Sequence, residues 1–208
     1  MVLAALVLLG LGVAIAVRVD RGSSLGPLRA RIVAVAQSQI GYRTDPADTY
    51  CNKFSAYWDA GTDTCGDDNL DEQWCADFAA WAWKQAGAAV SYRLAPGYLN
   101  SNSASFYVWG TEHGTWHPVG SQYTPQPGDV AVYGLDTSSV TAVHVAIVVV
   151  AGDDAAPDVV NGDGDRTGYS VVEVGNHQAF ADVQERGAPL SGYVSPTPAT
   201  SAAATSSA

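Results

Sequence analysis

The spacing of the hydrophobic residues changes along the chain, and this change is the strongest constraint on the fold. In the first half, apolar side chains recur every three or four residues, which places them on one face of a helix. In the second half, β-branched residues gather in short runs bounded by turn residues, a pattern typical of strands. The sequence therefore predicts an α+β domain in which N-terminal helices pack on an antiparallel β-sheet.

The boundaries of these elements follow from local signals. The first helix begins at Pro27, a residue that suits the first helical position, and ends by Gly41. Two further helices are expected over residues 74–86 and 103–113, and strands over 130–133, 142–150, 170–174 and 190–194. Residues 44–71 are predicted to be a long polar loop, and Asn161-Gly162-Asp163-Gly164 to be a turn.

The chain of 208 residues has room for one globular domain with short flanking segments. Residues 28–194 form the predicted domain, which is expected to be a monomer, and residues 18–27 form a linker before it. Residues 195–208 read SPTPATSAAATSSA and lack large apolar groups, so we expect a disordered tail. A net charge of -11 argues against nucleic acid as a partner, because phosphate binding requires clustered Lys and Arg.

The first 17 residues, MVLAALVLLGLGVAIAV, contain no charged side chain. As a helix they would span about 25 Å, so residues 1–17 fit either a transmembrane anchor or a secretory signal with Ala14-Ile15-Ala16 as its cleavage site. No Lys or Arg precedes this run, whereas Arg18 and Arg21 follow it, which by the positive-inside rule alone would leave the domain in the cytoplasm. We instead expect a basic leader upstream and an exported protein, either anchored in the membrane or secreted.

Cys75 and His144 are the residues on which a nucleophilic mechanism would depend. Cys75 stands at the start of the second predicted helix, where the dipole and free N–H groups lower a cysteine pKa. A thiolate nucleophile needs a histidine to accept its proton and a third polar group to orient that histidine. His144 lies within an apolar predicted strand, and the next strand ends in Glu173-Val174-Gly175-Asn176. Each has a structural alternative, as a small apolar core cysteine and as a hydrogen-bonded core histidine.

Four stretches occur in an order that resembles the CHAP family (cysteine, histidine-dependent amidohydrolase/peptidase). They are Trp74-Cys75-Ala76-Asp77-Phe78, Pro127-Gly128-Asp129-Val130, His144-Val145-Ala146-Ile147-Val148 and Val174-Gly175-Asn176-His177. The resemblance implies a papain-like α+β fold and cleavage of amide bonds in peptidoglycan. It also implies Cys75 as the nucleophile and His144 as the general base, which later acts as the acid.

The resemblance leaves two candidates for the third catalytic residue. Asn176 is preferred because it stands where the family often has an Asn or another polar residue, and Glu173 is its rival because some members use a carboxylate. The two are three residues apart on a strand end and should point to opposite sides, so only one is expected to reach His144. Gln73 is a candidate side-chain donor to the oxyanion, and a solvated loop residue is its alternative.

The expected function is hydrolysis of a peptidoglycan amide, either the N-acetylmuramoyl–L-alanine bond or a peptide bond in the stem or cross-bridge. One alternative is a non-catalytic wall-binding or conjugation/secretion-machinery component with the same fold. Another is a hydrolase or transferase that acts on a different amide.

Cys51 and Cys65 bracket part of the polar loop and leave Cys75 as the odd cysteine. An oxidised pair would close a loop of roughly 15 residues, stabilise the fold by about 3 kcal/mol and indicate an exported protein. The alternative is two reduced loop thiols.

No cofactor or metal is expected from the sequence. His113 and His117 are four residues apart, but Gly114 and Pro118 break the helix that a zinc pair would need. Some CHAP members bind calcium near the nucleophile, which here corresponds to an acidic stretch more commonly found as a solvated loop. Its residues are Asp67, Asp68, Asp71 and Glu72.

Overall fold

The computed structural model describes residues 25–151, 157–166, 169–175 and 188–199. The apolar segment predicted over residues 1–17 lies outside these ranges. Within them, no helix has the length and apolar character needed to cross a membrane.

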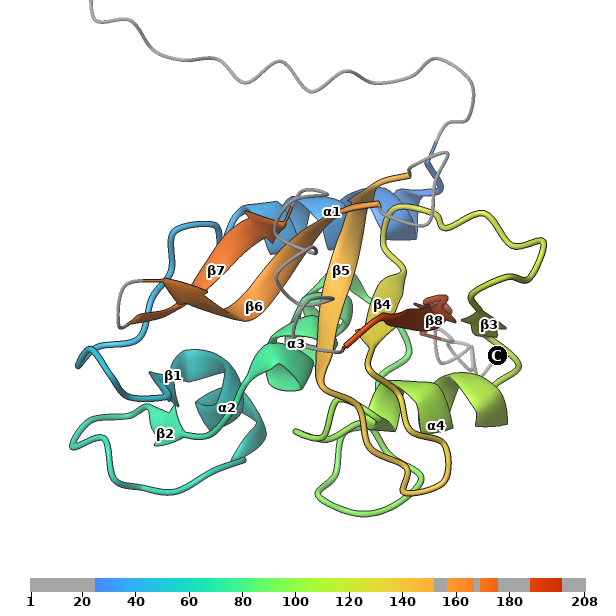
Figure 1. Ribbon diagram of the computed structural model, residues 1–208. Helices are drawn as coiled ribbons and strands as arrows, with labels where there is room; N and C mark the ends of the chain where they lie inside the picture. The colour runs from blue at the N-terminus through green and yellow to red at the C-terminus, as the bar shows by residue number, and fades with distance from the viewer. Residues whose placement is uncertain (1–24, 152–156, 167–168, 176–187, 200–208) are drawn as a thin grey trace, which may run out of the picture.

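Helices precede most of the strands along the chain (Figure 1). The helices are α1 (Pro27–Gln37), α2 (Lys53–Trp58), α3 (Cys75–Ala86) and α4 (Ser105–Glu112). The strands are β1 (Cys51–Asn52), β2 (Leu70–Asp71), β3 (Trp116–Pro118), β4 (Val130–Tyr133), β5 (His144–Val150), β6 (Asp158–Arg166), β7 (Tyr169–Gly175) and β8 (Leu190–Val194). The main sheet has the order β3-β8-β4-β5-β6-β7, and every neighbouring pair is antiparallel. The predicted α+β class is therefore confirmed.

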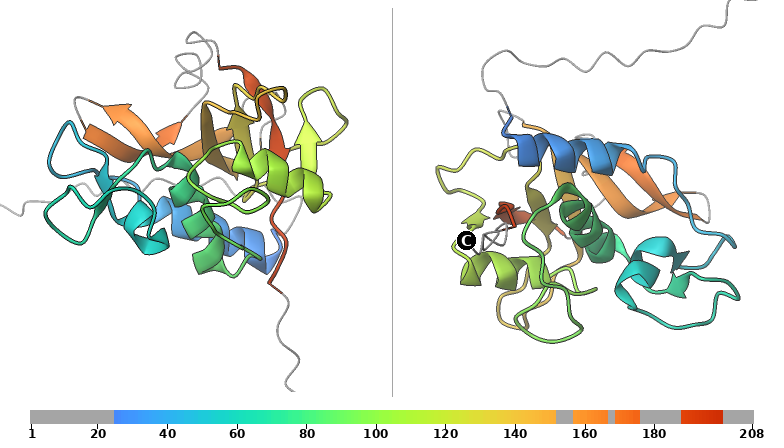
Figure 2. Two further views of the ribbon diagram at one scale, coloured as in Figure 1. Left: turned by 90° about the horizontal axis from the view of Figure 1, so that it is seen from below. Right: turned by 180° about the vertical axis from the view of Figure 1, so that it is seen from behind.

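Helix α3 is the centre of the helical layer, which lies against one side of the sheet (Figure 2). It packs on β5 and β6, with α1 and α2 beside it. Alanines at 76, 79, 80 and 82 are fully buried, and their small side chains let the sheet approach the helix closely. At the closest point Gly162 lies over Phe78, where an added Cβ would come within 2.6 Å of the Phe78 Cβ. This close contact fixes the start of α3 against the β6 end of the sheet.

The segment 44–71 is not the long loop predicted from its polar composition, because it contains α2 and the two-stranded sheet of β1 and β2. The Asn52 Oδ1 caps α2 by accepting hydrogen bonds from the backbone N–H groups of Phe54 and Ser55, at 2.9 and 2.8 Å. A disulfide between Cys51 and Cys65 closes the segment, as predicted, with the two Cα atoms 5.6 Å apart. The two strands have only two residues each, and the six-residue helix lies in a polar stretch, so neither an apolar run nor a hydrophobic period revealed them.

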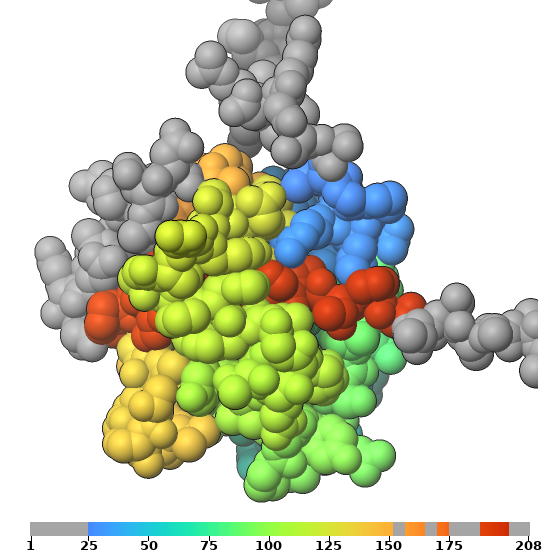
Figure 3. All heavy atoms as spheres, turned by 90° about the vertical axis from the view of Figure 1, so that its right-hand side faces the viewer, coloured from blue at the N-terminus to red at the C-terminus, as the bar shows by residue number. Residues whose placement is uncertain are grey.

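Two further predictions are corrected by the structure. Residues 161–164 form part of β6 and not a turn, although the register shifts between Asn161 and Gly164 and Asp163 adopts a φ of 61°. This β-bulge accounts for the turn-like composition. Residues 195–199, expected to begin a disordered tail, instead bond to the end of α3, with Ala89 N donating to Thr197 O at 2.7 Å and Ala199 N to Gly87 O at 3.1 Å. In Figure 3 the C-terminal segment crosses this face of the molecule as a red band.

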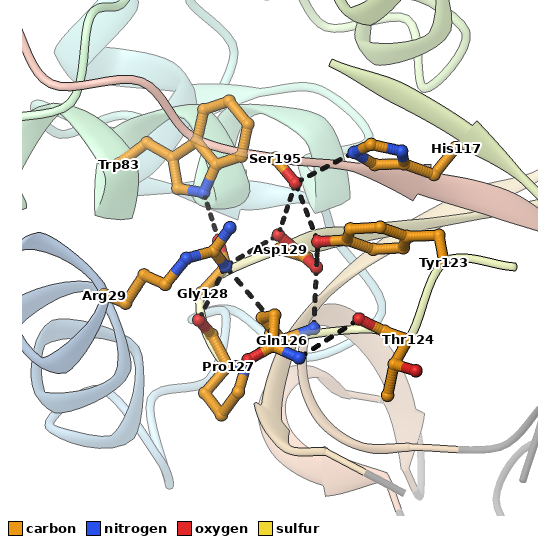
Figure 4. A network of polar contacts seen from close by, with 10 residues as sticks. All are labelled: Arg29, Trp83, His117, Tyr123, Thr124, Gln126, Pro127, Gly128, Asp129 and Ser195. Carbon is orange, nitrogen blue, oxygen red and sulfur yellow. Dashed lines mark hydrogen bonds and ion pairs between the residues drawn. The ribbon is translucent and has the colours of Figure 1, made fainter. Parts of the chain in front are cut away.

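The Asp129 carboxylate is the hub of a polar network that holds distant parts of the chain together (Figure 4). Its side chain is fully buried. It accepts hydrogen bonds from Arg29 Nη1 at 2.7 Å, the Tyr123 hydroxyl at 2.6 Å, the Gln126 backbone N–H at 2.8 Å and the Ser195 hydroxyl at 3.0 Å. The network thus joins α1, the segment before β4 and the segment after β8.

Neighbouring groups extend this network to α3. The Trp83 indole donates to the Gly128 carbonyl at 2.9 Å, and Arg29 donates to the Pro127 carbonyl at 2.9 Å. Gly128 has a φ of 91°, and its missing Cβ leaves room for the Arg29 backbone, which a Cβ would approach to 3.3 Å. The Pro127-Gly128-Asp129 motif is therefore a structural junction in this protein.

We expect Asp129→Ala to lower the free energy of unfolding by about 3 kcal/mol, because it leaves several buried donors without their acceptor. Chemical denaturation of the full chain, with the disulfide intact, would measure this loss. Asp63→Ala removes a carboxylate from an exposed position and is the matched control. Equal stability of the two variants would contradict the structural role of Asp129.

Candidate active site

Cys75 is the first residue of α3, and its side chain is only 6% exposed. The helix start has no side-chain cap from its own N-cap residue, Trp74. Instead Asp163, which β6 brings to this point, accepts a hydrogen bond from the Trp74 backbone N–H at 3.2 Å. The Ser170 hydroxyl on β7 donates to the other carboxylate oxygen of Asp163. The β6–β7 hairpin therefore holds the end of the helix that carries the thiol.

The Cys75 thiol is held between a loop and a strand. Its sulfur lies 3.2 Å from the Ser103 hydroxyl, in the segment just before α4. The backbone N–H of Val145, in β5, also forms a hydrogen bond to the sulfur. The pairing of β5 with β6 ends at Ile147, which lies opposite Val160. The Val145 N–H is therefore two residues beyond the last paired residue of β5. The thiol therefore approaches β5 where that strand leaves the paired part of β6.

His144 immediately precedes Val145 and is the first residue of β5. Its Nε2 lies 2.9 Å from the Oδ1 of Asn161 on β6. Because a carbonyl oxygen only accepts hydrogen bonds, this contact places the hydrogen of a neutral imidazole on Nε2 and leaves Nδ1 able to accept a proton. The imidazole lies 6.2 Å from the Tyr133 ring, measured between centroids, whereas Val145 packs in the cluster that contains Cys75. The structure thus brings Cys75 to the backbone next to His144, and the His144 ring to Asn161.

The electrostatic setting of Cys75 differs from the sequence-based expectation. A helix start was expected to lower its pKa, but burial raises the pKa of the thiol to about 12. The negative charge of Asp163 acts in the same direction, and that of Asp77 adds a smaller effect. The hydrogen bonds from Ser103 and Val145 lower the pKa and only partly offset these effects. The resting thiol is therefore protonated at neutral pH, and its activation requires a base.

Asp77, two residues after Cys75, is a buried carboxylate that ties α3 to its neighbours. It accepts hydrogen bonds from the Ser55 hydroxyl at 2.6 Å and from the Tyr92 hydroxyl. The Trp58 indole donates to its backbone carbonyl at 3.1 Å and stacks on Tyr92, with ring centroids 4.2 Å apart. Burial raises the pKa of Asp77 to about 6, although both side-chain hydrogen bonds lower it.

Three more residues were predicted for the site, and the structure describes two of them, Gln73 and Glu173. Gln73 is exposed, with its backbone N–H bonded to the Glu72 carboxylate at 3.0 Å. Glu173 on β7 lies directly across from Asn161, and its carboxylate packs over Gly164. Asn176 lies outside the described residues, so its role stays a prediction.

Three residues that contact the site were not singled out from the sequence: Asn161, Asp163 and Ser103. The first two were concealed by the Asn-Gly-Asp-Gly pattern, which reads as a turn but forms a bulged strand. The available signal for Asn161 is its position in the strand that follows the His144 strand directly, because consecutive antiparallel strands usually pair. Ser103 carried no signal, since a loop far from Cys75 in sequence brings it to the thiol.

The described residues contain no group of three or more His, Cys, Asp or Glu side chains placed to hold a metal ion. The acidic side chains before α3 instead bond locally. Asp67 accepts from Asn69 N at 2.8 Å, and Asp71 from the Thr64 hydroxyl at 3.2 Å.

Comparison with known families gives a match to part of the chain. The CHAP domain family matches residues 66–163, a range that includes Cys75, Ser103, His144 and Asn161. These residues therefore belong to a CHAP domain, a papain-like fold whose members are generally hydrolases or peptidases acting on cell-wall peptidoglycan. No curated protein and no solved structure matches the chain.

Asp163→Asn is expected to lower the pKa of the Cys75 thiol, because it removes the charge that raises this pKa most while keeping an oxygen for the Trp74 N–H. Alkylation by iodoacetamide at pH 8 should accelerate several-fold, because only the thiolate reacts. The control is Asp158→Asn, a change to an exposed residue at the other end of β6. An unchanged or slower rate in Asp163→Asn would show that Asp163 does not oppose ionisation of the thiol.

The raised pKa of Asp77 predicts that this group makes the fold less stable as pH rises. The folded state binds its proton up to about pH 6, whereas the unfolded chain releases it near 3.8. Unfolding free energy should therefore fall by about 2 kcal/mol, through Asp77 alone, between pH 4 and pH 7. The difference between wild type and Asp77→Asn, measured by denaturation at each pH, isolates this effect. A difference that does not vary over this range would argue against it.

Proposed function

We propose that this protein is a peptidoglycan hydrolase that cleaves an amide bond with Cys75 as its nucleophile. The observation that carries the proposal is the pairing of two contacts at one end of β5. Val145 N–H bonds the buried thiol, and the adjacent His144 is oriented by Asn161. A nucleophile, a base and an orienting amide are the three parts that thiol-dependent acyl transfer requires.

In the proposed mechanism, His144 accepts the Cys75 proton on Nδ1 as the thiolate attacks the substrate carbonyl. Asn161 holds Nε2–H and so fixes the imidazole in the tautomer that can accept this proton. The oxyanion forms near the start of α3, where the first backbone N–H groups of a helix have no intrahelical partner. The Gln73 side chain is a further candidate donor from the preceding loop.

The second half of the cycle returns the thiol. His144 donates its proton to the leaving amine, which leaves an acyl group on the Cys75 sulfur. Water, deprotonated by His144, then attacks the thioester, and the carboxylic acid product and the free thiol are released. Burial of the sulfur makes this proton exchange essential, because the thiol is not ionised in the resting enzyme.

We propose an exported location, anchored in the membrane or secreted, for this activity. The Cys51–Cys65 disulfide supports it, because disulfides persist mainly in oxidising compartments. The proposed function includes both an amidase and an endopeptidase, since the two cleave different amides by the same chemistry. A wall-binding or conjugation-machinery component with the same fold is the second candidate, and it requires no reaction at Cys75.

The full chain, incubated with purified peptidoglycan, should release soluble fragments whose masses identify the bond that is cut. Parallel incubations with and without calcium would test the acidic loop before α3. Cys75→Ala and His144→Ala should each release none, because each removes a group that forms or breaks bonds. Binding of the wall without release, by a folded wild-type protein, would favour the non-catalytic candidate.

The third residue can be assigned with matched variants. Asn161→Ala should reduce fragment release by about a hundredfold, because the imidazole loses the contact that sets its tautomer. Asn176→Ala and Glu173→Gln make comparable changes at the residues suggested by the family resemblance. If one of these two variants loses most of its fragment release while Asn161→Ala stays near wild type, the orienting role belongs to Asn176 or Glu173 instead.

A further inference from the structure

Ser103 contacts the atom on which the proposed reaction depends. Its Oγ is 3.2 Å from the Cys75 sulfur, and its side chain is 6% exposed. The serine lies in the segment that leads into α4, so a part of the chain outside α3 and β5 supplies this contact to the thiol. A buried hydroxyl at this distance has no bulk water competing for its hydrogen bond.

From this contact we infer that Ser103 is a catalytic residue whose hydroxyl donates a hydrogen bond to the Cys75 thiolate and stabilises it. The inference rests on the proposed function, because it concerns the ionised state of the proposed nucleophile. In the resting state either group can donate, since both carry a hydrogen. Once His144 removes the thiol proton, the sulfur can only accept, and Ser103 becomes the donor.

The surroundings of the thiol explain why a donor is needed there. The charged groups acting on the sulfur are Asp163, from β6, and Asp77, from α3 itself, and both disfavour a thiolate. His144 begins β5, one residue before Val145. The Ser55 hydroxyl, on α2, donates a hydrogen bond to the Asp77 carboxylate. On α1, Arg31 binds the Ala86 carbonyl at the opposite end of α3. The favourable contacts to the sulfur are thus the Ser103 hydroxyl and the Val145 N–H.

The same hydrogen bond would act twice in one turnover. During attack it stabilises the thiolate that forms when the proton moves to His144. After the acyl group is transferred, the thioester sulfur carries no charge and the bond weakens. When water expels the sulfur again, the hydroxyl stabilises the departing thiolate before His144 returns the proton. No atom of Ser103 is gained or lost in the cycle.

Ser105 provides a matched control for this role. It is a serine of similar burial, two residues along, and its hydroxyl bonds to the Asn100 backbone carbonyl and N–H, both at 3.2 Å. Ser103→Ala and Ser105→Ala therefore remove the same group from neighbouring buried positions, but only the first removes a contact to the thiol. Ser103→Thr keeps a hydroxyl at the position.

The test is the pH dependence of iodoacetamide alkylation of the full chain, in which Cys75 is the free cysteine. In Ser103→Ala the profile should move to higher pH, with about tenfold slower alkylation at a fixed pH, a factor equal to about 1.4 kcal/mol. Ser105→Ala should follow the wild-type profile, and Ser103→Thr should lie nearer to wild type than Ser103→Ala does. A Ser103→Ala profile that coincides with wild type, in protein shown to be folded by its near-ultraviolet circular dichroism, would overturn the inference.

Alkylation requires no wall substrate, so failure of this inference differs from failure of the proposed function. A shifted profile in a protein that releases no wall fragments would keep Ser103 as the thiolate donor and reject the hydrolase. If Ser103→Ala releases wall fragments as wild type does and its alkylation profile is not shifted, the proposed hydrolase function stands and the role of Ser103 is rejected.

Discussion

The buried carboxylate of Asp129 is the interaction on which the arrangement of this domain depends. A charge removed from water is tolerated only where donors replace its hydration, and here four groups from three parts of the chain do so. Two of them, Arg29 and Ser195, are 166 residues apart in sequence. Through the adjacent Gly128 carbonyl and the Trp83 indole, the same junction reaches α3, so the helix that carries Cys75 is held at one end by the Asp129 network.

The other end of α3 is held by a second carboxylate with a different consequence. Asp163 fixes the Trp74 backbone but also disfavours ionisation of the neighbouring thiol. Burial, Asp163 and Asp77 oppose the thiolate, whereas Ser103 and Val145 favour it. Such a balance keeps the resting sulfur protonated and leaves its activation to His144. It also protects the sulfur from oxidants, which react with thiolates far faster than with thiols.

The elements predictable from the sequence are those with a helical hydrophobic period or a run of strand-forming residues next to turn residues. Helix α3 and strand β5 each bury a continuous face, and the predicted ranges for β4 and β8 agree with the structure. The short elements α2, β1 and β2 depend on the Asn52 cap and on the disulfide, which leave little trace in hydrophobic spacing. Cys75 and His144 could be proposed from their positions on elements and from the resemblance to a family. Asn161 and Ser103 could not, because a bulge concealed one and a tertiary contact created the other.

The position of β8 has a consequence for how the domain forms. It is the last of the described strands in sequence, yet it lies inside the sheet, between β3 and β4. Until residues 190–194 have been synthesised, β4 lacks one of its two neighbours and β3 has none in the main sheet. Ser195, which follows directly, then completes the Asp129 network. The sheet therefore reaches its full width only after residues 190–195 have left the ribosome, and a shorter nascent chain cannot assemble this fold.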